Sequence, residues 1–148
     1  RPLEYIIAIA LFMLSISGAT TLLMGVVGGM DGIGLMYFFL STMLGCLLTV
    51  MLACSISLRK NSRTNAVMFI NLISILNGFV PLIGMLYPSA TVVTKYWYTQ
   101  QVKEVIGSIY SGDTQGLWFS FGVIIASLVI FTLLFVVSYR KNRIFSQE

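Results

Sequence analysis

Polar side chains in the third apolar run are the residues of this sequence that come nearest to a chemical site. Asn71, Ser74, Asn77 and Pro81 recur at three- and four-residue intervals, so a helix places them along one polar face. Such side chains inside an apolar helix commonly hydrogen-bond to a neighbouring helix, and the alternative is that they line a substrate route. Pro81 also crowds the carbonyl of Asn77, so we expect a kink or an unwinding of the helix near Asn77.

Groups that catalyse reactions or bind metals are scarce. The chain has no histidine, and its five acidic residues form no cluster, so neither a metal site nor an acid–base pair is visible. Cys46 and Cys54 would lie about 12 Å apart on a straight helix, too far for a disulfide. No Walker-type glycine loop with a lysine occurs. The sequence therefore predicts no catalytic residues, no metal and no cofactor in this chain.

Four long apolar runs must position these residues. They cover residues 5–27, 33–58, 66–87 and 117–139, and none contains a charged residue. At about 1.5 Å per residue, each run could cross a hydrocarbon layer roughly 30 Å thick. Backbone groups in lipid need internal partners, so the runs should be helices. With 57% hydrophobic and 9% charged residues, the 148-residue chain is predicted to be an all-α membrane protein with one transmembrane domain.

The basic residues predict how this domain is oriented. Most of them precede the first run, join the second to the third, or follow the fourth, namely Arg1, Arg59, Lys60, Arg63, Arg140, Lys141 and Arg143. These three segments share one side of a four-pass topology, which the positive-inside rule assigns to the cytoplasm. We therefore expect a multi-pass plasma-membrane protein with both termini cytoplasmic. A patch for nucleic-acid phosphates or anionic lipid heads is the alternative, and we expect no nucleic-acid partner.

Small residues repeat along the second run at four-residue spacing. They are Ser41, Gly45, Thr49, Ala53 and Ser57. In lipid there is little hydrophobic drive between helices, so a ridge of small residues allows backbones to approach closely and make van der Waals contact. We expect this ridge to pack against another helix of the same chain, or against a second copy or partner subunit.

The segment 88–116 is predicted to contain a short amphipathic helix. Apolar side chains at helical spacing occupy one side and polar ones the other: Tyr98, Val102, Val105, Ile106 and Ile109 against Gln101, Glu104 and Ser108. Tyr96, Trp97 and Tyr98 begin it, as is typical where aromatic rings settle near lipid headgroups. We expect the segment to lie in the outer interface or to dip into the membrane.

The order of these features resembles the C-terminal part of a type 2 ABC exporter permease. A basic turn, Arg59-Lys60-Asn61-Ser62-Arg63, precedes a helix that ends in Leu76-Asn77-Gly78-Phe79-Val80-Pro81-Leu82. The latter is similar to the family's small-Gly-Phe-x-x-Pro signature, with Asn77 where serine is more usual. Short outer helices follow, and the last span ends in Tyr139-Arg140-Lys141.

This resemblance implies an architecture and a function. The four runs would be the third to sixth helices of the permease, an N-terminal portion would be missing before Arg1, and segment 88–116 would be re-entrant. A second permease copy and a cytoplasmic ATPase that binds ATP and Mg would complete an exporter. Arg59, Lys60 and Arg63 would face the ATPase. The polar face of residues 71–81 would line the cargo route, and Tyr96, Trp97 and Tyr98 would form its outer gate.

A non-transporting four-helix scaffold or assembly protein is the main alternative, and an associated ATPase would distinguish the two. A proton-coupled exporter would need a carboxylate within a span, whereas Glu4 and Asp31 lie outside the uninterrupted apolar runs.

Overall fold

The computed structural model describes residues 2–58, 63–113 and 115–145, and within them the side chains of residues 8, 11–58, 68–113 and 115–141. Across these ranges the chain forms helices and turns and no strand, which confirms the all-α prediction. The helices are α1 (Pro2–Val27), α2 (Gly32–Ser57), α3 (Arg63–Leu86), the 3-10 turn η1 (Pro88–Ala90), α4 (Thr91–Thr94), α5 (Tyr98–Ser111) and α6 (Leu117–Phe145).

Three segments are long and apolar enough to cross a membrane: Gly32–Ser57 in α2, Met68–Leu86 in α3 and Leu117–Lys141 in α6. In α1 the apolar part with described side chains, Leu11–Val27, is shorter. The predicted apolar helices are therefore present, and a bilayer environment is supported. That these three segments cross a membrane, and that α1 is a fourth span, remain predictions.

The distribution of side chains is inverted relative to that of a water-soluble protein. Large apolar side chains are exposed along α1, α3 and α6, whereas several buried side chains are polar: Thr21, Ser41, Ser55, Asn77, Gln100, Gln101, Ser120 and Ser138. Soluble proteins bury mainly apolar residues. Between helices in lipid, small and polar residues supply close packing and hydrogen bonds instead. The apolar exterior is the surface that lipid would cover.

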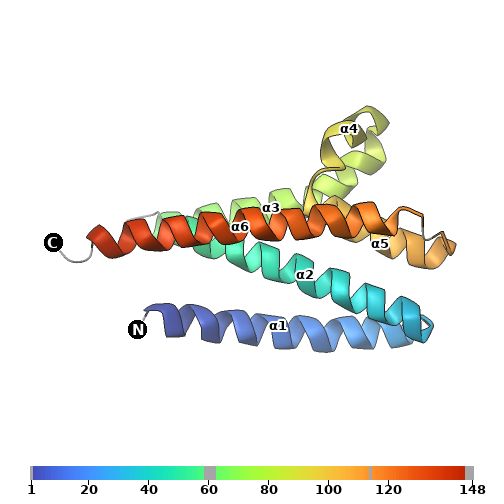
Figure 1. Cartoon of the computed structure of the whole chain (residues 1–148), viewed down its shortest axis with the longest axis horizontal. Coiled ribbons are helices and arrows are strands. Elements are labelled where there is room, and N and C mark those ends of the chain that lie inside the picture. Colours follow the sequence, from blue (N-terminus) through green and yellow to red (C-terminus); the bar gives the residue numbers. More distant parts are fainter. Residues whose placement is uncertain (1, 59–62, 114, 146–148) are drawn as a thin grey trace.

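The long helices lie roughly along one axis (Figure 1). The beginning of α1 and the end of α6 lie at one end of the bundle, while α1 ends, α2 begins and α6 begins at the other. Helix α2 runs from α1 toward α3 and α6, and α1 packs mainly on α2. Gly25 makes this pair close, because a Cβ there would meet the side chains of Leu35 and Phe38.

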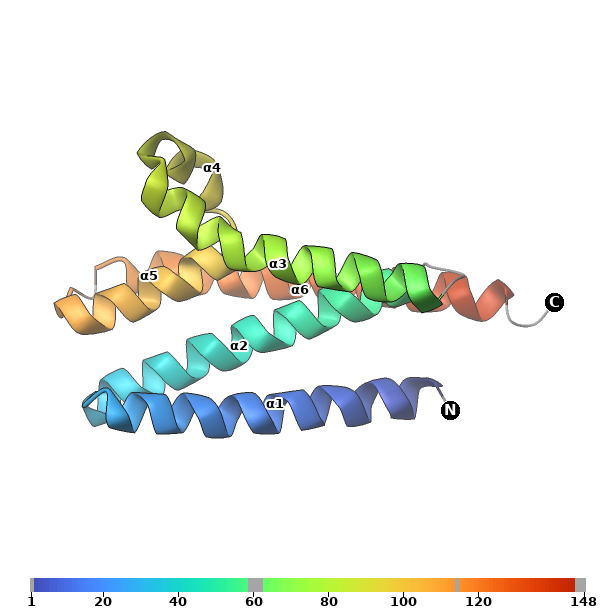
Figure 2. The same ribbon diagram turned by 180° about the vertical axis from the view of Figure 1, so that it is seen from behind.

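Helix α3 bends away from the bundle in its C-terminal part. Both views show the end of α3 projecting sideways together with η1 and α4 (Figures 1 and 2). Pro81 lies inside this helix, which stays continuous through Leu86. A proline removes one backbone hydrogen bond and crowds the preceding turn, and here the helix bends without unwinding.

Helix α5 is packed inside the bundle, against α2, α6 and α3. Its first residue is Tyr98, whose hydroxyl lies 2.9 Å from that of Thr49. Counted from the start of α2 at Gly32, Thr49 is past the middle of that helix. The amphipathic helix predicted here is present, but Gln101 was expected on its exposed side and is buried. The reason is that the first turn of α5 is covered on several sides and that the Gln101 amide donates a hydrogen bond to the carbonyl of Lys95.

Candidate functional site

The central feature of the interior is a chain of hydrogen bonds that joins α2, α3 and α5. The indole Nε1 of Trp97 donates to Asn77 Oδ1 at 2.9 Å, and Asn77 Nδ2 donates to the Tyr98 hydroxyl at 2.9 Å. The Thr49 hydroxyl donates to the carbonyl of Gly45 at 2.9 Å, so the Tyr98 hydroxyl must be the donor to Thr49. Each bond therefore has a defined direction. We call these four side chains the Tyr98 network.

Burial makes this network energetically important. Tyr98 is 1% exposed and Asn77 5% exposed, and the Tyr98 ring packs edge-on against Phe131 of α6 with centroids 5.8 Å apart. A phenol is protonated near neutral pH, so the Tyr98 hydroxyl can donate. A buried amide or hydroxyl without a partner would be costly, and here each finds one.

The polar face predicted on α3 divides into two parts. Asn77 points into the bundle, while Asn71 and Ser74 are exposed and make no recorded hydrogen bond to the described residues. Pro81 is half-buried. An α-helix turns by about 100° per residue, so over the six residues from Asn71 to Asn77 the two side chains come to point in directions roughly 120° apart. The structure therefore does not place these residues on one surface.

The three aromatic residues predicted as an outer gate also point in different directions. Tyr96 is exposed, with its ring centroid 6.4 Å from that of Phe119 and with the ammonium of Lys95 4.9 Å from its centre. Trp97 reaches Asn77 through its indole, and Tyr98 is buried. Only Trp97 and Tyr98 belong to the central network.

Part of the small-residue ridge of α2 lies against α5, at Gly45 and Thr49. Ser41 and Gly45 are buried, Thr49 and Ala53 are half-buried, and Ser57 at the end of the helix is exposed. A Cβ built on Gly45 would stand 3.0 Å from Cγ2 of Val102, so the absence of a side chain permits this approach. Ridge packing within one chain is thus observed for the part of the ridge near α5.

The predicted ATPase-facing residues lie outside what the structure describes. Arg59 and Lys60 are not among the described residues, and α3 begins at Arg63, whose side chain is also not described. Their assignment stays a prediction.

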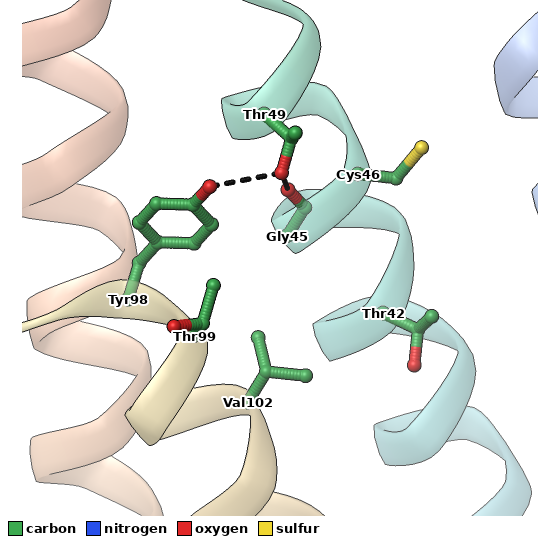
Figure 3. Close-up of a pocket in the computed structure, with 7 residues that line it drawn as sticks. All are labelled: Thr42, Gly45, Cys46, Thr49, Tyr98, Thr99 and Val102. Carbon is green, nitrogen blue, oxygen red and sulfur yellow. Dashed lines mark hydrogen bonds between the residues drawn. The ribbon is translucent and has the colours of Figure 1, made fainter. Parts of the chain in front are cut away.

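A groove between α2 and α5 lies next to the network (Figure 3). Its volume is about 230 Å³, it opens at the surface of the bundle, and its lining residues are Thr42, Gly45, Cys46, Thr49, Tyr98, Thr99 and Val102. The hydroxyl oxygens of Thr42 and Thr99 are buried without a hydrogen-bond partner. The sequence pattern singled out neither threonine. The predicted ridge contains two of the lining residues, Gly45 and Thr49, but it indicated close packing of helices and no groove.

The chemistry that these groups can perform is hydrogen bonding. Among the described side chains no three His, Cys, Asp or Glu residues come together as metal ligands, and Cys46 and Cys54 are free thiols on α2. No model of a known protein family, no curated protein and no solved structure matches this chain.

Proposed function

We propose that this chain is a membrane-spanning permease subunit of an ATP-driven ABC exporter. In this proposal α1, α2, α3 and α6 cross the plasma membrane, and the segment from Pro88 to Gly116 is re-entrant. A second permease copy completes the translocation route, and a cytoplasmic partner binds ATP and Mg and hydrolyses the nucleotide. The proposal combines the sequence resemblance with one observation, the insertion of α5 into the bundle.

The position of Tyr98 is that observation. Thr49, its partner, lies about 25 Å along α2 from Gly32. If Gly32 is near the outer surface, Tyr98 lies at or beyond the middle of a hydrocarbon layer roughly 30 Å thick. Backbone that enters a membrane without crossing it must be covered by protein, and α2, α3 and α6 cover α5. A re-entrant outer helix is what the resemblance to the permease family implies for this segment.

The orientation follows from charge. Arg140 and Lys141 lie at the end of α6, whereas Trp118, which is 88% exposed, lies at its beginning. Basic residues on the cytoplasmic side and aromatic anchors at the interface are the usual arrangement. In this proposal both ends of the described bundle face the cytoplasm, as does the sequence segment between α2 and α3 that contains Arg59 and Lys60.

The exposed face of α3 supports a second subunit. Asn71 and Ser74 carry polar groups on the outside of a candidate span and have no recorded hydrogen-bond partner in the described chain. An unpaired amide facing lipid is unfavourable, so protein or a water-filled route is expected to cover this face. In this arrangement Asn71 and Ser74 face the cargo route, whereas Asn77 acts by holding α5 in place.

Identification of partners tests the proposal. The chain is purified from its native membrane in a mild detergent, and every co-purifying protein is identified by mass spectrometry. An ABC ATPase in stoichiometric amount is the expected result. Recovery of the chain with no ATPase, from membranes in which the complex has been stabilised by cross-linking, would contradict the proposal and favour a scaffold.

A further inference from the structure

Helix α5 carries a charged pair, Lys103 and Glu104, that the Tyr98 network does not use. We propose that the exposed face of α5 borders a water-filled crevice, which opens at the outer side of the membrane and reaches about half of its depth. The inference rests on one part of the proposed function, the re-entrant position of α5 in a membrane-spanning bundle. It depends neither on the ATPase nor on the nature of the cargo.

The exposed face of α5 differs in composition from the exposed faces of the long helices. In α1, α3 and α6 these faces carry large apolar side chains. The exposed residues of α5 are Glu104, Gly107, Tyr110 and Ser111, and none of them is aliphatic. The aliphatic side chains of α5 are buried or half-buried. This helix therefore presents a surface that suits water better than lipid tails.

Two glycine contacts give the depth of the charged pair. A Cβ on Gly34 would stand 2.9 Å from Cγ2 of Ile109. A Cβ on Gly45 would stand 3.0 Å from Cγ2 of Val102, so α5 runs back along α2 toward the end of the bundle where α1 meets α2 (Figure 2). The two glycines lie about 3 Å and about 20 Å from the start of α2. Glu104 lies between these contacts and closer to the deeper one, at about 15 Å, which is half of a hydrocarbon layer roughly 30 Å thick.

Charged groups at this depth need water or protein beside them. The side chains of Lys103 and Glu104 are 38% and 50% exposed, and Lys103 Nζ lies 3.5 Å from Glu104 Oε1. The same oxygen accepts a hydrogen bond from Gln100 Nε2 at 2.6 Å. A glutamate side chain is too short to reach the headgroups from the middle of the layer, and the lysine is held beside it. Lipid tails against the exposed half of this pair would be unfavourable, whereas water would solvate it.

The bend in α3 leaves this face of α5 open. Gln100, in the first turn of α5, is buried, and a Cβ on Gly84 of α3 would stand 3.1 Å from its Oε1. One turn further along α5, Glu104 is exposed. The C-terminal part of α3 projects sideways with η1 and α4 and does not follow α5 to its end (Figures 1 and 2). Among the described residues, α3 therefore covers the first turn of α5 and leaves the charged pair uncovered.

A partner protein is the alternative cover for this face. It would have to bury an ion pair whose charges are already balanced within this chain, and burial of such a pair contributes little to stability. Water needs no such compensation, and we therefore assign the face to water. The crevice gives polar molecules access from outside to the level of Glu104.

Cysteine accessibility in intact cells that make the chain tests the crevice. Cys46 and Cys54 are first replaced by alanine, and a single cysteine is then introduced as Glu104→Cys or Gly107→Cys. The probe is 2-sulfonatoethyl methanethiosulfonate, which is charged and does not cross membranes, added outside the cells. The intact mass of the purified chain reports the extent of reaction. Gly107→Cys keeps the ion pair, and its Cβ has no atom within 4 Å, so this variant decides the test if Glu104→Cys fails to fold.

Ile125→Cys on α6 is the matched control. Ile125 is 54% exposed on an apolar face and lies about 12 Å along α6 from Leu117, so it is less deep than Glu104. A thiol reacts as its thiolate, which forms in water and not among lipid tails. The two α5 cysteines should therefore react at least about tenfold faster than Ile125→Cys. Reaction of both α5 cysteines no faster than that of Ile125→Cys would overturn the crevice.

The depth of Trp97, measured by quenching with brominated lipids, separates this failure from a failure of the proposed function. Slow reaction of the α5 cysteines, with Trp97 deep in the hydrocarbon layer, would refute the crevice alone. Trp97 at the level of the headgroups would refute the re-entrant arrangement, and with it the crevice, even if both cysteines reacted quickly.

Discussion

Replacing Tyr98 with phenylalanine should destabilise the bundle more than its small chemical change suggests. The substitution removes one oxygen atom and leaves the ring against Phe131. It also removes the acceptor of Asn77 Nδ2 and the donor to Thr49 Oγ1. Thr49 keeps its bond to the Gly45 carbonyl, so the main loss falls on the Asn77 amide. Asn77 is buried and has no other recorded acceptor for this nitrogen.

The size of the effect can be worked out from these contacts. Interhelical hydrogen bonds in membrane proteins are worth about 0.6 kcal/mol each on average. A buried donor left without a partner costs about 1–3 kcal/mol. We therefore expect Tyr98→Phe to lower the free energy of unfolding by about 2 kcal/mol. Asn77→Leu combined with Tyr98→Phe should cost less than the sum of the two single changes, because the double variant leaves no unpaired amide.

The assay is reversible unfolding of the chain in mixed micelles by titration with SDS, followed by circular dichroism. Tyr110→Phe is the matched control on the same helix, since Tyr110 is 65% exposed and makes no recorded hydrogen bond. It should change the free energy of unfolding by less than about 0.5 kcal/mol. Equal effects of Tyr98→Phe and Tyr110→Phe would refute the importance of the Tyr98 network.

Three further predictions use the same assay. Gly45→Val should lower the free energy of unfolding by about 1–3 kcal/mol, because even a Cβ at this position would lie 3.0 Å from Cγ2 of Val102 on α5. An unchanged free energy of unfolding would argue against close packing of α2 and α5. Gly84→Ala should be destabilising, because the added Cβ would stand 3.1 Å from Gln100 Oε1. Gly78→Ala on the same helix should stabilise the chain by about 0.5–1 kcal/mol, because a Cβ there would have no atom within 4 Å. The reverse order of stabilities would show that α3 packs differently. Asp31→Ala should lower the free energy of unfolding by about 1 kcal/mol, because the Asp31 carboxylate caps α2 by accepting a hydrogen bond from the Gly34 N–H at 2.7 Å. Asp31→Ser should keep most of this stability, because a serine hydroxyl can also cap the helix. Equal stability of all three chains would exclude the cap.

The transport prediction concerns Asn77→Leu. If the chain is an exporter permease, this variant should still insert into the membrane but should lower cargo export and cargo-stimulated ATP hydrolysis, because it releases α5 from α3. Transport equal to that of the unaltered chain, measured at equal membrane abundance, would contradict a role for Asn77 in positioning the outer segment.

The long helices could be predicted from sequence because membrane thickness constrains them strongly. The run at 33–58 became Gly32–Ser57, and the last run begins at Leu117 as expected. Continuous apolar length is a one-dimensional property, so it can be read without knowing which residues meet in space.

The site could be predicted only in part, because it depends on contacts between distant segments. Asn77 was identified as a polar residue in an apolar helix, but its pairing with Tyr98 depends on how deep α5 enters the bundle. Gln101 was misplaced for the same reason: periodicity assumes one covered side, and α5 is covered on several. The unpaired hydroxyls of Thr42 and Thr99 depend on the local rotamer and on a crossing at Gly45, neither of which leaves a sequence pattern.

The depth of α5 is the claim on which the proposed function depends, and the two tryptophans of the chain can measure it. Trp118→Phe leaves Trp97 as the single fluorophore, and Trp97→Phe leaves Trp118. Each variant is reconstituted with lipids brominated at different positions along the acyl chain. The account predicts that deep bromines quench Trp97 most strongly and that bromines near the headgroup quench Trp118 most strongly. Strongest quenching of both tryptophans near the headgroup would place α5 at the membrane surface and contradict the re-entrant arrangement.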